Sequence, residues 1–431
     1  MSYRIKEQRS RAGPDCPRLK HSGPRTPSEH CTSHQGKGLK AYNNEDLRLA
    51  AKRALPRGLY EYIARGSEDE TALGRNRRAL DAIKFRPKVF VNVAGRNQKT
   101  TVLGKEQASP LIIAPTGAAG LMWYQGEIAL ARAAQQAGVP FTVSTSAITS
   151  MEKIAQASQA RLWFQLYIWP DFAMAEELIG RAEAAGYDTL MVTVDTIVNP
   201  NREYNSRNSF NVPIRFNARN TLDVCRHPLW LIRVFLKYLL NSGMPQFENY
   251  PDAMRMSMTG NRSGKWVVTK KSETLNWDDL SRLRDRWKGS LVIKGILDVE
   301  DADEAARRGV DGIVVSNHGG RNLDCVRSPL EVLEDIANRV GDRVDVIADS
   351  GFTRGSDVVK ALALGAKAVM VGRCPLYGLA TGGEAGALES LNFYRDEIDR
   401  VLAFMGVNDI RKLERRHVHL DPMMFGLEAF K

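Results

Sequence analysis

Short apolar runs alternate with longer amphipathic stretches from about residue 111 onward. The runs are rich in branched residues and often bounded by glycine, which is typical of buried parallel strands. They lie at 111–114, 141–144, 162–167, 189–195, 291–294, 313–315, 346–349 and 368–371. Segments with helical periodicity separate them, including 127–137, 173–185, 299–308 and 356–364. Eight such units predict an α/β fold, the TIM (β/α)8 barrel. An open doubly wound sheet is the alternative, but it lacks a glycine-rich dinucleotide turn after its first strand.

The segments outside this repeat predict the domain organisation. Residues 1–40 are basic and poor in apolar residues, so we expect a disordered tail, with a transit peptide or an over-called start codon as alternatives. A short N-terminal helical region follows, with helices near 44–54 and 59–64 and a third that opens with the acids at 68–70. The barrel domain is expected over 41–431, with a long insert after the fourth strand at 196–290.

The insert contains an apolar and aromatic run at 226–240, with Arg233 and Lys237 on one helical face. This run is too short to cross a bilayer, but it suits a helix lying in the membrane interface. A helix that covers the barrel mouth, or packs against another subunit, fits the same pattern equally well.

The amino-acid composition excludes few classes of function. The 431 residues are 43% hydrophobic and 26% charged, as in ordinary soluble proteins, and the net charge is +11. This charge is compatible with nucleic acid, an anionic membrane or acidic substrates, and selects none of them. The five cysteines lack metal-ligand spacing, so we expect free thiols, a reducing compartment and no metal site.

Almost every predicted strand ends in a chemically useful residue. In a barrel these ends converge on one face, where active sites lie. The residues are Thr116, Ser144, Gln165, Tyr167, Thr193, Asp195, Lys294, His318, Asp349 and Arg373. A single polar residue at a strand end is usually a helix cap or a turn former. A polar residue at the end of nearly every strand, all at the same end of the barrel, predicts an active site there.

Two features sharpen this prediction. After the strand at 313–315, the sequence Ser-Asn-His-Gly-Gly-Arg at 316–321 displays a histidine and an arginine on a turn that two glycines can bend sharply. The segments 349–356 and 371–373 each place glycine and arginine after a strand. The loops after the seventh and eighth strands are the usual phosphate site of this barrel, so a phosphorylated ligand is predicted.

These motifs resemble the FMN-dependent L-2-hydroxy acid oxidases and dehydrogenases. Residues 316–321 are similar to the active-site signature of that family, with Asn322 where glutamine is usual. Further motifs at 114–116, 163–167, 193–196, 293–295 and 372–373 follow in the order and spacing of the family. The resemblance runs from about residue 42 to the C-terminus and implies FMN as the cofactor.

The resemblance also implies residue roles. His318 would be the catalytic base, paired with Asp195, while Tyr167 and Lys294 would act beside the reacting oxygen and flavin N1. Substrate contacts would come from Tyr62, Arg202, Arg321, Tyr167, Gly117 and Ser146, with both arginines clamping a carboxylate. Cofactor contacts would come from Ala114, Pro115, Thr116, Ser144, Gln165, Thr193, Lys294, Ser316, Asp349, Gly351, Arg354, Gly372 and Arg373.

Departures from the family pattern refine the expected function. Thr353 stands where many members carry an arginine, so the phosphate would depend more on Arg373 and Arg354. Gly117 and Ser146 replace the alanine and tryptophan of the small-substrate oxidases. Both changes enlarge the pocket and resemble the membrane-associated dehydrogenases of lactate or mandelate.

The expected activity is oxidation of a lactate- or mandelate-like L-2-hydroxy acid to the 2-oxo acid, with electrons passed to a quinone or cytochrome-type acceptor. An oxidase that uses O2 and produces H2O2 is the alternative. FMN barrels that isomerise or monooxygenate fit the paired arginines less well, and a non-enzymatic binding protein is supported by the net charge alone. The resemblance implies a homotetramer in the cytoplasm, peripheral on the inner face of the cytoplasmic membrane through 226–240, without a nucleic-acid partner.

Overall fold

A computed structural model of the chain describes residues 40–210, 217–251 and 272–426. Residues 41–431 cluster into one compact unit. The predicted disordered tail at 1–40 lies, except for Lys40, outside the described residues.

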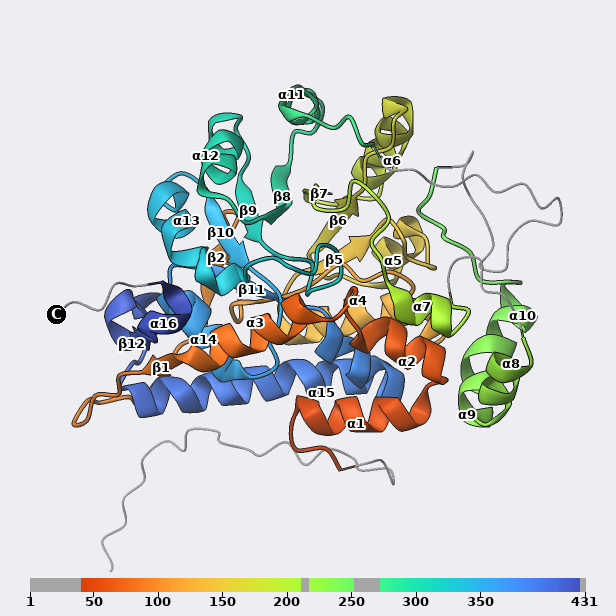
Figure 1. The fold of residues 1–431 in the computed structure, drawn as a ribbon, viewed down its shortest axis with the longest axis horizontal. Helices are drawn as coiled ribbons and strands as arrows, with labels where there is room; N and C mark the ends of the chain where they lie inside the picture. The colour runs from red at the N-terminus through yellow and green to blue at the C-terminus, as the bar shows by residue number, and fades with distance from the viewer. Residues whose placement is uncertain (1–39, 211–216, 252–271, 427–431) are drawn as a thin grey trace, which may run out of the picture. The chain divides into compact units, whose positions relative to one another are not determined.

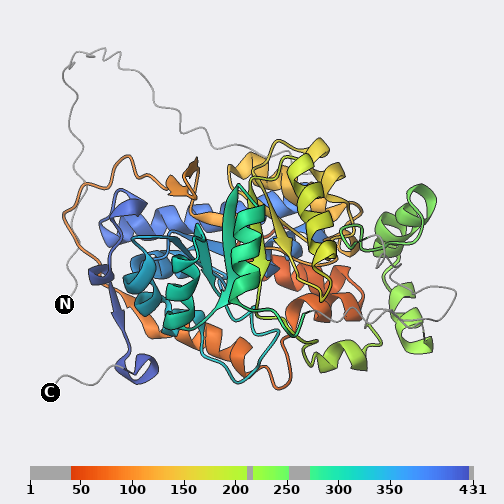
Figure 2. The same ribbon diagram turned by 90° about the horizontal axis from the view of Figure 1, so that it is seen from above.

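A closed barrel of eight parallel strands forms the centre of this unit (Figures 1 and 2). The strands follow in the order β10-β11-β4-β5-β6-β7-β8-β9. Their bounds are β4 Leu111–Ile113, β5 Phe141–Ser144, β6 Leu162–Leu166, β7 Thr189–Thr193, β8 Ser290–Ile296, β9 Gly312–Val315, β10 Asp345–Ala348 and β11 Ala368–Val371. Side chains including Trp163, Met191 and Met370 fill the interior, while alternate residues pack outward against helices. Both faces are therefore apolar, and the predicted TIM barrel is confirmed.

Helices surround the barrel. They are α4 Gly126–Ala137, α5 Met151–Ala157, α6 Phe172–Ala184, α11 Trp277–Arg286, α12 Val299–Arg307, α13 Leu333–Val340, α14 Gly355–Ala363 and α15 Arg373–Met405. Ion pairs join α11 to both sequence neighbours in the ring, from Arg282 to Glu176 at 2.8 Å and from Arg308 to Asp278 at 3.0 Å. α11 is thus the barrel helix of the fourth unit, although it lies within the insert predicted at 196–290.

The N-terminal region supplies α1 Asn44–Ala54, α2 Arg57–Ala64 and α3 Thr71–Ala82. α1 lies along α15 (Figure 1), and the Ser390 hydroxyl donates to Asn44 Oδ1 at 2.7 Å. The acids at 68–70 were expected inside the first turn of the third helix, but α3 begins only at Thr71. Instead the carboxylate of Asp324, after β9, accepts hydrogen bonds from the amides of Thr71 and Ala72. A distant side chain therefore caps this helix.

A small hairpin covers the amino-terminal end of the barrel. It consists of β2 Thr100–Val102 and β3 Lys105–Gln107. The Leu103 amide donates to Asp345 Oδ2 at 2.6 Å, and Arg161 Nη1 donates to the Val102 carbonyl at 2.7 Å. The carboxyl end of the barrel is left for a ligand. The remaining short elements are β1 Ile83–Phe85, which pairs with β12 Val418–Leu420, and η1 Ala119–Leu121, η4 Pro329–Glu331, η5 Ile410–Lys412, η6 Arg415–His417 and α16 Pro422–Phe425.

The insert forms helices beside the barrel, drawn in green in Figures 1 and 2. They are α7 Glu203–Arg207, α8 Ala218–Cys225, α9 Pro228–Trp230, the π-helical turns η2 Leu231–Leu236 and α10 Lys237–Asn241. The last three are consecutive, as expected for the apolar run. This helical run is fixed to the barrel because Trp230 Nε1 donates to the Leu121 carbonyl at 2.8 Å, and the Gln125 amide donates to the Tyr238 hydroxyl at 3.1 Å.

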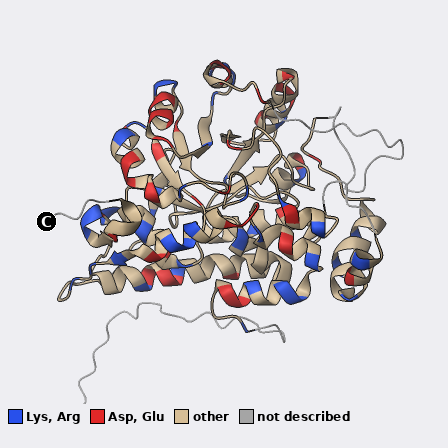
Figure 3. Ribbon diagram, viewed as in Figure 1, with Lys and Arg blue, Asp and Glu red and all other residues tan. Residues whose placement is uncertain are grey.

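Two surface properties bear on the expected partners. Basic and acidic residues are interspersed along the outer helices (Figure 3). Across the described ranges, no helix is both long and apolar enough to span a bilayer.

Candidate active site

The carboxyl ends of the strands surround a cavity of about 650 Å³. Most residues predicted for the site lie on its wall. They are Tyr62, Ala114, Pro115, Thr116, Gly117, Ser144, Ser146, Gln165, Tyr167, Thr193, Arg202, Lys294, His318, Arg321, Asp349, Gly351, Gly372 and Arg373. Asp195 and Ser316 lie behind this wall, each hydrogen-bonded to a residue that lines it. Of the predicted residues, Arg354 is the one that the structure does not bring to the site.

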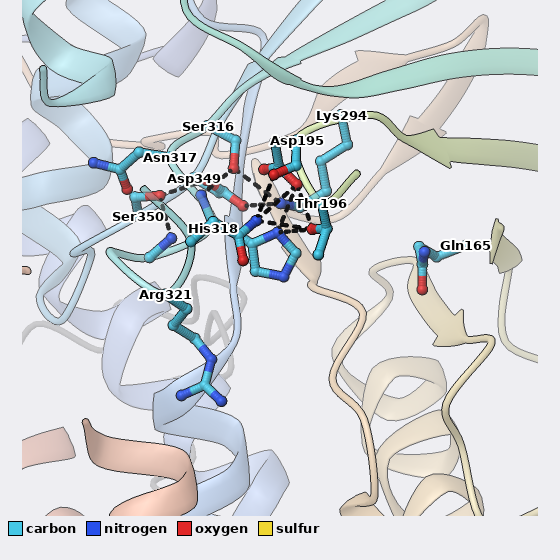
Figure 4. A network of polar contacts seen from close by, with 12 residues as sticks. Gln165, Asp195, Thr196, Lys294, Ser316, Asn317, His318, Arg321, Asp349 and Ser350 are labelled. Carbon is cyan, nitrogen blue, oxygen red and sulfur yellow. Dashed lines mark hydrogen bonds and ion pairs between the residues drawn. The ribbon is translucent and has the colours of Figure 1, made fainter. Parts of the chain in front are cut away.

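A histidine–aspartate pair lies on one side of the cavity (Figure 4). His318 Nδ1 is 2.8 Å from Asp195 Oδ1, and the Thr196 hydroxyl donates to the same oxygen at 2.9 Å. An ionised carboxylate can only accept, so Nδ1 carries the proton of a neutral imidazole. The lone pair of Nε2 is then available to take a proton, and the pair can serve as a general base.

The backbone that presents this pair needs glycine at specific positions. His318, Gly319 and Gly320 all have positive φ, between 57° and 70°. A Cβ on Gly320 would lie 2.6 Å from the Leu73 amide nitrogen. Gly295 has φ +113°, and a Cβ there would lie 2.5 Å from Asp195 Cβ. At residues 318–320 the backbone turns sharply, and at Gly295 it approaches the Asp195 side chain closely.

Burial and charge set the protonation of the pair. Burial lowers the pKa of His318 to about 4, although the Asp195 carboxylate acts in the opposite direction. Burial works against the charge of Asp195, but the charges of His318 and Lys294 and the hydrogen bonds from His318 and Thr196 hold its pKa well below its usual range. At neutral pH the histidine is therefore neutral and the aspartate ionised, as a base requires.

We expect this low pKa to appear in the pH profile. A base must be unprotonated, so kcat/KM should stay level from neutral pH downward and fall only as the pH approaches about 4. The measurement is kcat/KM of the FMN-loaded enzyme from pH 4 to 9, with reassay at pH 7 after each exposure to exclude unfolding. An acid limb centred at or above 6.5, the ordinary histidine value, would contradict the assignment.

Lys294 places a buried cation beside the pair. Its Nζ lies 3.1 Å from Asp349 Oδ2 and donates to the Ser316 hydroxyl at 2.9 Å. Burial favours the neutral amine, but the carboxylates of Asp349 and Asp195 hold its pKa above the usual value. The cation is therefore retained within the cavity wall, where it can stabilise negative charge that develops on a bound group.

Three arginines bring positive charge to the cavity without a matching acid. Arg321 Nη1 donates to the carbonyls of Tyr62 and Arg65, and Arg373 Nε donates to that of Ile63. Arg202 Nε donates to the Arg321 carbonyl at 3.1 Å. Among the described residues, no carboxylate forms an ion pair with any of these three guanidiniums. Burial and the charges of Arg202 and Arg373 lower the pKa of Arg321 to about 9. Unmatched cations in a cavity favour anionic ligands.

Three polar atoms on the cavity wall need a partner. Thr116 Oγ1, Gln165 Nε2 and Thr193 Oγ1 are buried and have no hydrogen-bond partner among the described residues. Such atoms are costly unless a ligand pairs with them. Figure 4 shows Gln165 across from His318. These donors and acceptors, together with the Lys294 cation, fit the polar edge of a flat heteroaromatic ring, and the residues present therefore fit FMN.

The phosphate expectation is corrected in part. The N-terminus of α14 was expected to bind the anion, but the amides of Thr353 and Arg354 donate to Asp357 at 3.0 Å, and that of Gly355 donates to Glu397. The Arg354 guanidinium pairs with Glu397 at 2.9 Å, outside the cavity. Arg373, at the start of α15, is the arginine of this region that lines the cavity together with Gly351 and Gly372.

Aromatic residues of the insert complete the cavity and were not predicted. Phe210, Phe247 and Tyr250 lie on its wall. Phe247 stacks on Tyr250 with ring centroids 4.9 Å apart, and Phe210 meets Tyr62 edge to face at 5.7 Å. The Tyr250 hydroxyl is 3.4 Å from Ser146 Oγ. Nothing in their local sequence marked them, since they belong to no motif; only the position of the insert beside the barrel mouth brings them here.

Space beside these rings depends on Gly117. A Cβ at this position would lie 3.1 Å from the Tyr62 hydroxyl and 3.2 Å from Ser146 Cβ. Glycine therefore keeps this part of the cavity open. As for metals, no cluster of three or more potential ligands occurs in the described part of the chain.

Comparisons with known proteins agree with this geometry. The profile of a family described as FMN-dependent dehydrogenase matches residues 51–420. The chain is 42% identical to (S)-mandelate dehydrogenase of Pseudomonas putida over 86% of its length and 92% of the relative. It is 40% identical to an L-lactate dehydrogenase of Caulobacter vibrioides over 85% and 95%. The crystal structure of the monotopic membrane protein (S)-mandelate dehydrogenase superposes with a TM-score of 0.81 and 41% identity, covering 89% of this chain and all of that one.

Proposed function

This chain belongs to the FMN-dependent dehydrogenase family and oxidises L-2-hydroxy acids with FMN, and from that premise we propose that its substrate is mandelate-like. The product would be the corresponding 2-oxo acid. We further propose that the electrons leave to a quinone or cytochrome-type acceptor.

The observation that carries the proposal is the set of guanidiniums without acids beside a neutral histidine. A 2-hydroxy acid has a carboxylate for Arg321 and Arg202. Its adjacent carbon bears the hydrogen and the hydroxyl that oxidation changes, and His318 accepts the proton that this carbon–hydroxyl group loses. A planar guanidinium suits a carboxylate because it can donate two parallel hydrogen bonds. The Tyr62 hydroxyl would add a donor to the same carboxylate. Oxidation of this carbon is the chemistry that such a constellation serves.

The remaining roles follow from position. His318 takes the proton, and Asp195 stabilises the imidazolium that forms. Tyr167 would donate to the oxygen on the reacting carbon, since burial raises the pKa of its phenol and keeps it protonated. When bound, FMN supplies the acceptor for the two electrons that the substrate loses. Lys294 would balance the negative charge that this transfer creates.

FMN would be held at both ends. We assign contacts with the ring and the ribityl chain to Ala114, Pro115, Thr116, Ser144, Gln165 and Thr193, and contacts toward the phosphate to Asp349, Gly351, Gly372 and Arg373. Ser316, behind the wall, would serve the cofactor through its hydrogen bond from Lys294. The unpaired polar atoms on the wall support the first group, and the unmatched charge of Arg373 supports the second.

The aromatic wall supports a substrate with an aryl side chain. Phe210, Phe247 and Tyr250 offer apolar ring surface, and Gly117 and Ser146 leave room beside it. Edge-to-face and stacked ring contacts contribute about 0.5–1.5 kcal/mol beyond burial. A methyl group, as in lactate, would leave much of this surface without contact.

The test is anaerobic reduction of the purified FMN-loaded protein. (S)-mandelate and L-lactate are added separately, and bleaching of the visible flavin band is followed. Faster bleaching with mandelate supports the proposal, and faster bleaching with lactate overturns the aryl assignment. If neither acid bleaches the flavin, the assignment of 2-hydroxy acids as substrates is contradicted.

The electron acceptor is tested in the same cuvette by admitting air. Slow recolouring with little peroxide supports a quinone or cytochrome-type acceptor. Rapid recolouring with stoichiometric H2O2 would instead establish the oxidase alternative.

We also propose that the chain is peripheral on the inner face of the cytoplasmic membrane, through the helical run that ends in α10. Val234 and Tyr238 are buried against the barrel, while Leu229, Ile232, Leu236, Leu239 and Leu240 are exposed, with basic Arg233 and Lys237 among them. An exposed apolar stripe flanked by cations suits the interface of an anionic bilayer. The family resemblance adds a homotetramer, which sedimentation equilibrium would test.

Replacement of one exposed apolar residue in this stripe should weaken membrane binding. Ile232→Asp places a charge where the proposed helix meets lipid, so we expect at least a fivefold loss of binding to vesicles containing anionic lipid. Vesicle co-sedimentation provides the measurement. Phe404→Asp, at an exposed apolar position on α15, serves as the control and should bind like the wild type. Equal loss in both variants, or in neither, would contradict the assignment.

A further inference from the structure

Asn322 follows the His318–Arg321 turn directly and is partly buried. Its amide nitrogen lies 2.9 Å from the Asp195 carbonyl, 3.1 Å from Asp195 Oδ1 and 2.8 Å from Thr196 Oγ1. Its amide oxygen accepts a hydrogen bond from Arg202 Nη2 at 3.4 Å. One side chain therefore contacts both the partner of the histidine and an arginine of the anion site.

The directions of these hydrogen bonds are fixed by chemistry. Asp195 is ionised and can only accept, so the Thr196 hydroxyl donates its proton to Asp195 Oδ1 (Figure 4). Thr196 Oγ1 must then accept from the Asn322 amide. Asp195 Oδ1 receives three donors, from His318, Thr196 and Asn322, while Oδ2 is buried and has no partner in the part of the chain that the structure describes. The orientation of the carboxylate thus depends on donors gathered at a single oxygen.

The oxygen of the Asn322 amide faces Arg202. Arg202 donates to the Arg321 carbonyl through Nε and to Asn322 Oδ1 through Nη2. These are its side-chain hydrogen bonds among the described residues, and both acceptors are on the loop that carries His318. The position of the Arg202 guanidinium is therefore defined relative to the base by this loop.

We propose that Asn322 is a positioning residue that holds the Asp195 carboxylate toward His318 with its nitrogen and the Arg202 guanidinium toward the substrate with its oxygen. This inference rests on the proposed function. It assigns the nitrogen side to the chemical step and the oxygen side to substrate binding. Because the amide is planar and short, the two groups are set at a fixed separation.

Loss of the whole amide should affect both steps. In Asn322→Ala, we expect kcat to fall at least tenfold and KM for the hydroxy acid to rise about tenfold, which are the effects of losing a hydrogen bond to a charged group. Asn322→Gln keeps both functional ends and should recover most of each loss. Leu323→Ala is the matched control, because this neighbour is 68% exposed on the same loop. Bound FMN, measured by absorbance, should be equal in all four proteins.

Asn322→Asp tests the nitrogen side of the amide separately from the oxygen side, because it replaces only the nitrogen and nearly keeps the shape of the side chain. The new carboxyl would face Asp195, with Arg202 on its other side and His318 and Lys294 near the same acid. Two adjacent carboxylates cannot both ionise easily, so one pKa rises. While it is protonated, the new carboxyl can still donate a hydrogen bond to Asp195. Once it is ionised, its negative charge repels the Asp195 carboxylate. We expect kcat to decline as pH rises from about 5 to 8, a limb that the wild type lacks, while KM stays near the wild-type value.

Oxidation of a 2-hydroxy acid by the wild type is measured first. A failure of the proposed function would appear at that stage, before any Asn322 variant is compared. A loss in Asn322→Ala that Asn322→Gln reverses, together with the new pH limb in Asn322→Asp, supports the role. The inference is overturned if Asn322→Ala keeps kcat and KM within threefold of wild type. It is equally overturned if Asn322→Asp has the wild-type pH profile, or if Asn322→Gln is as impaired as Asn322→Ala.

Discussion

Replacement of His318 by asparagine should lower kcat by about 10⁴-fold while FMN stays bound. The variant loses Nε2, the ring nitrogen that accepts the substrate proton, together with the Nδ1 contact to Asp195 Oδ1 at 2.8 Å. Asparagine is the appropriate replacement because His318 has φ +57°, a conformation that asparagine tolerates better than most residues. Stopped-flow reduction of the flavin by substrate under anaerobic conditions measures the step directly.

The control for this variant is His419→Asn, at an exposed histidine of β12 far in sequence from the cavity. It should keep the wild-type rate. If His318→Asn reduces its flavin within tenfold of the wild-type rate, His318 is not the base. A loss of bound FMN in this variant would instead mean that the turn at 318–320 has been disturbed.

Replacement of Arg321 by methionine should lower kcat/KM for the hydroxy acid by about 10²–10³-fold. This range is about 2.7–4.1 kcal/mol and lies within the roughly 2–5 kcal/mol cost of truncating one partner of a desolvated charge pair. Arg321→Lys keeps the charge but loses the planar fork, so it should recover only part of the loss. Steady-state kinetics with the acid and with its methyl ester provide the measurement.

The ester is the decisive substrate because it has no carboxylate charge. We expect the wild type to prefer the acid strongly, and Arg321→Met to lose most of this preference while its rate with the ester changes little. Arg282→Met, at an exposed arginine on α11 that pairs with Glu176, is the control and should keep the wild-type preference. An equal loss with acid and ester would indicate that Arg321 acts only by tying down the carbonyls of Tyr62 and Arg65.

Local sequence determined the barrel because each strand is specified by its own neighbours. Runs such as the one at 313–315 are apolar on both faces, and only a parallel sheet covered by helices on one side and filled on the other buries such runs. Since parallel strands in a barrel end at one mouth, the polar residues after them could be placed together without coordinates. That reasoning brought His318, Lys294 and Gln165 to one cavity, and the motifs gave FMN and the hydroxy acid.

Tertiary structure decided what depends on partners distant in the chain. Arg354 and Arg373 have similar local surroundings, a glycine-containing loop after a strand, yet one pairs with Glu397 outside the cavity and the other lines it. Phe247 and Tyr250 reach the cavity only because the insert packs beside the mouth. The contacts of Asn322 with Asp195 join residues 127 positions apart. Local periodicity has no information about such contacts, because the direction of a loop side chain is set by whichever charge or cavity the completed fold places beside it.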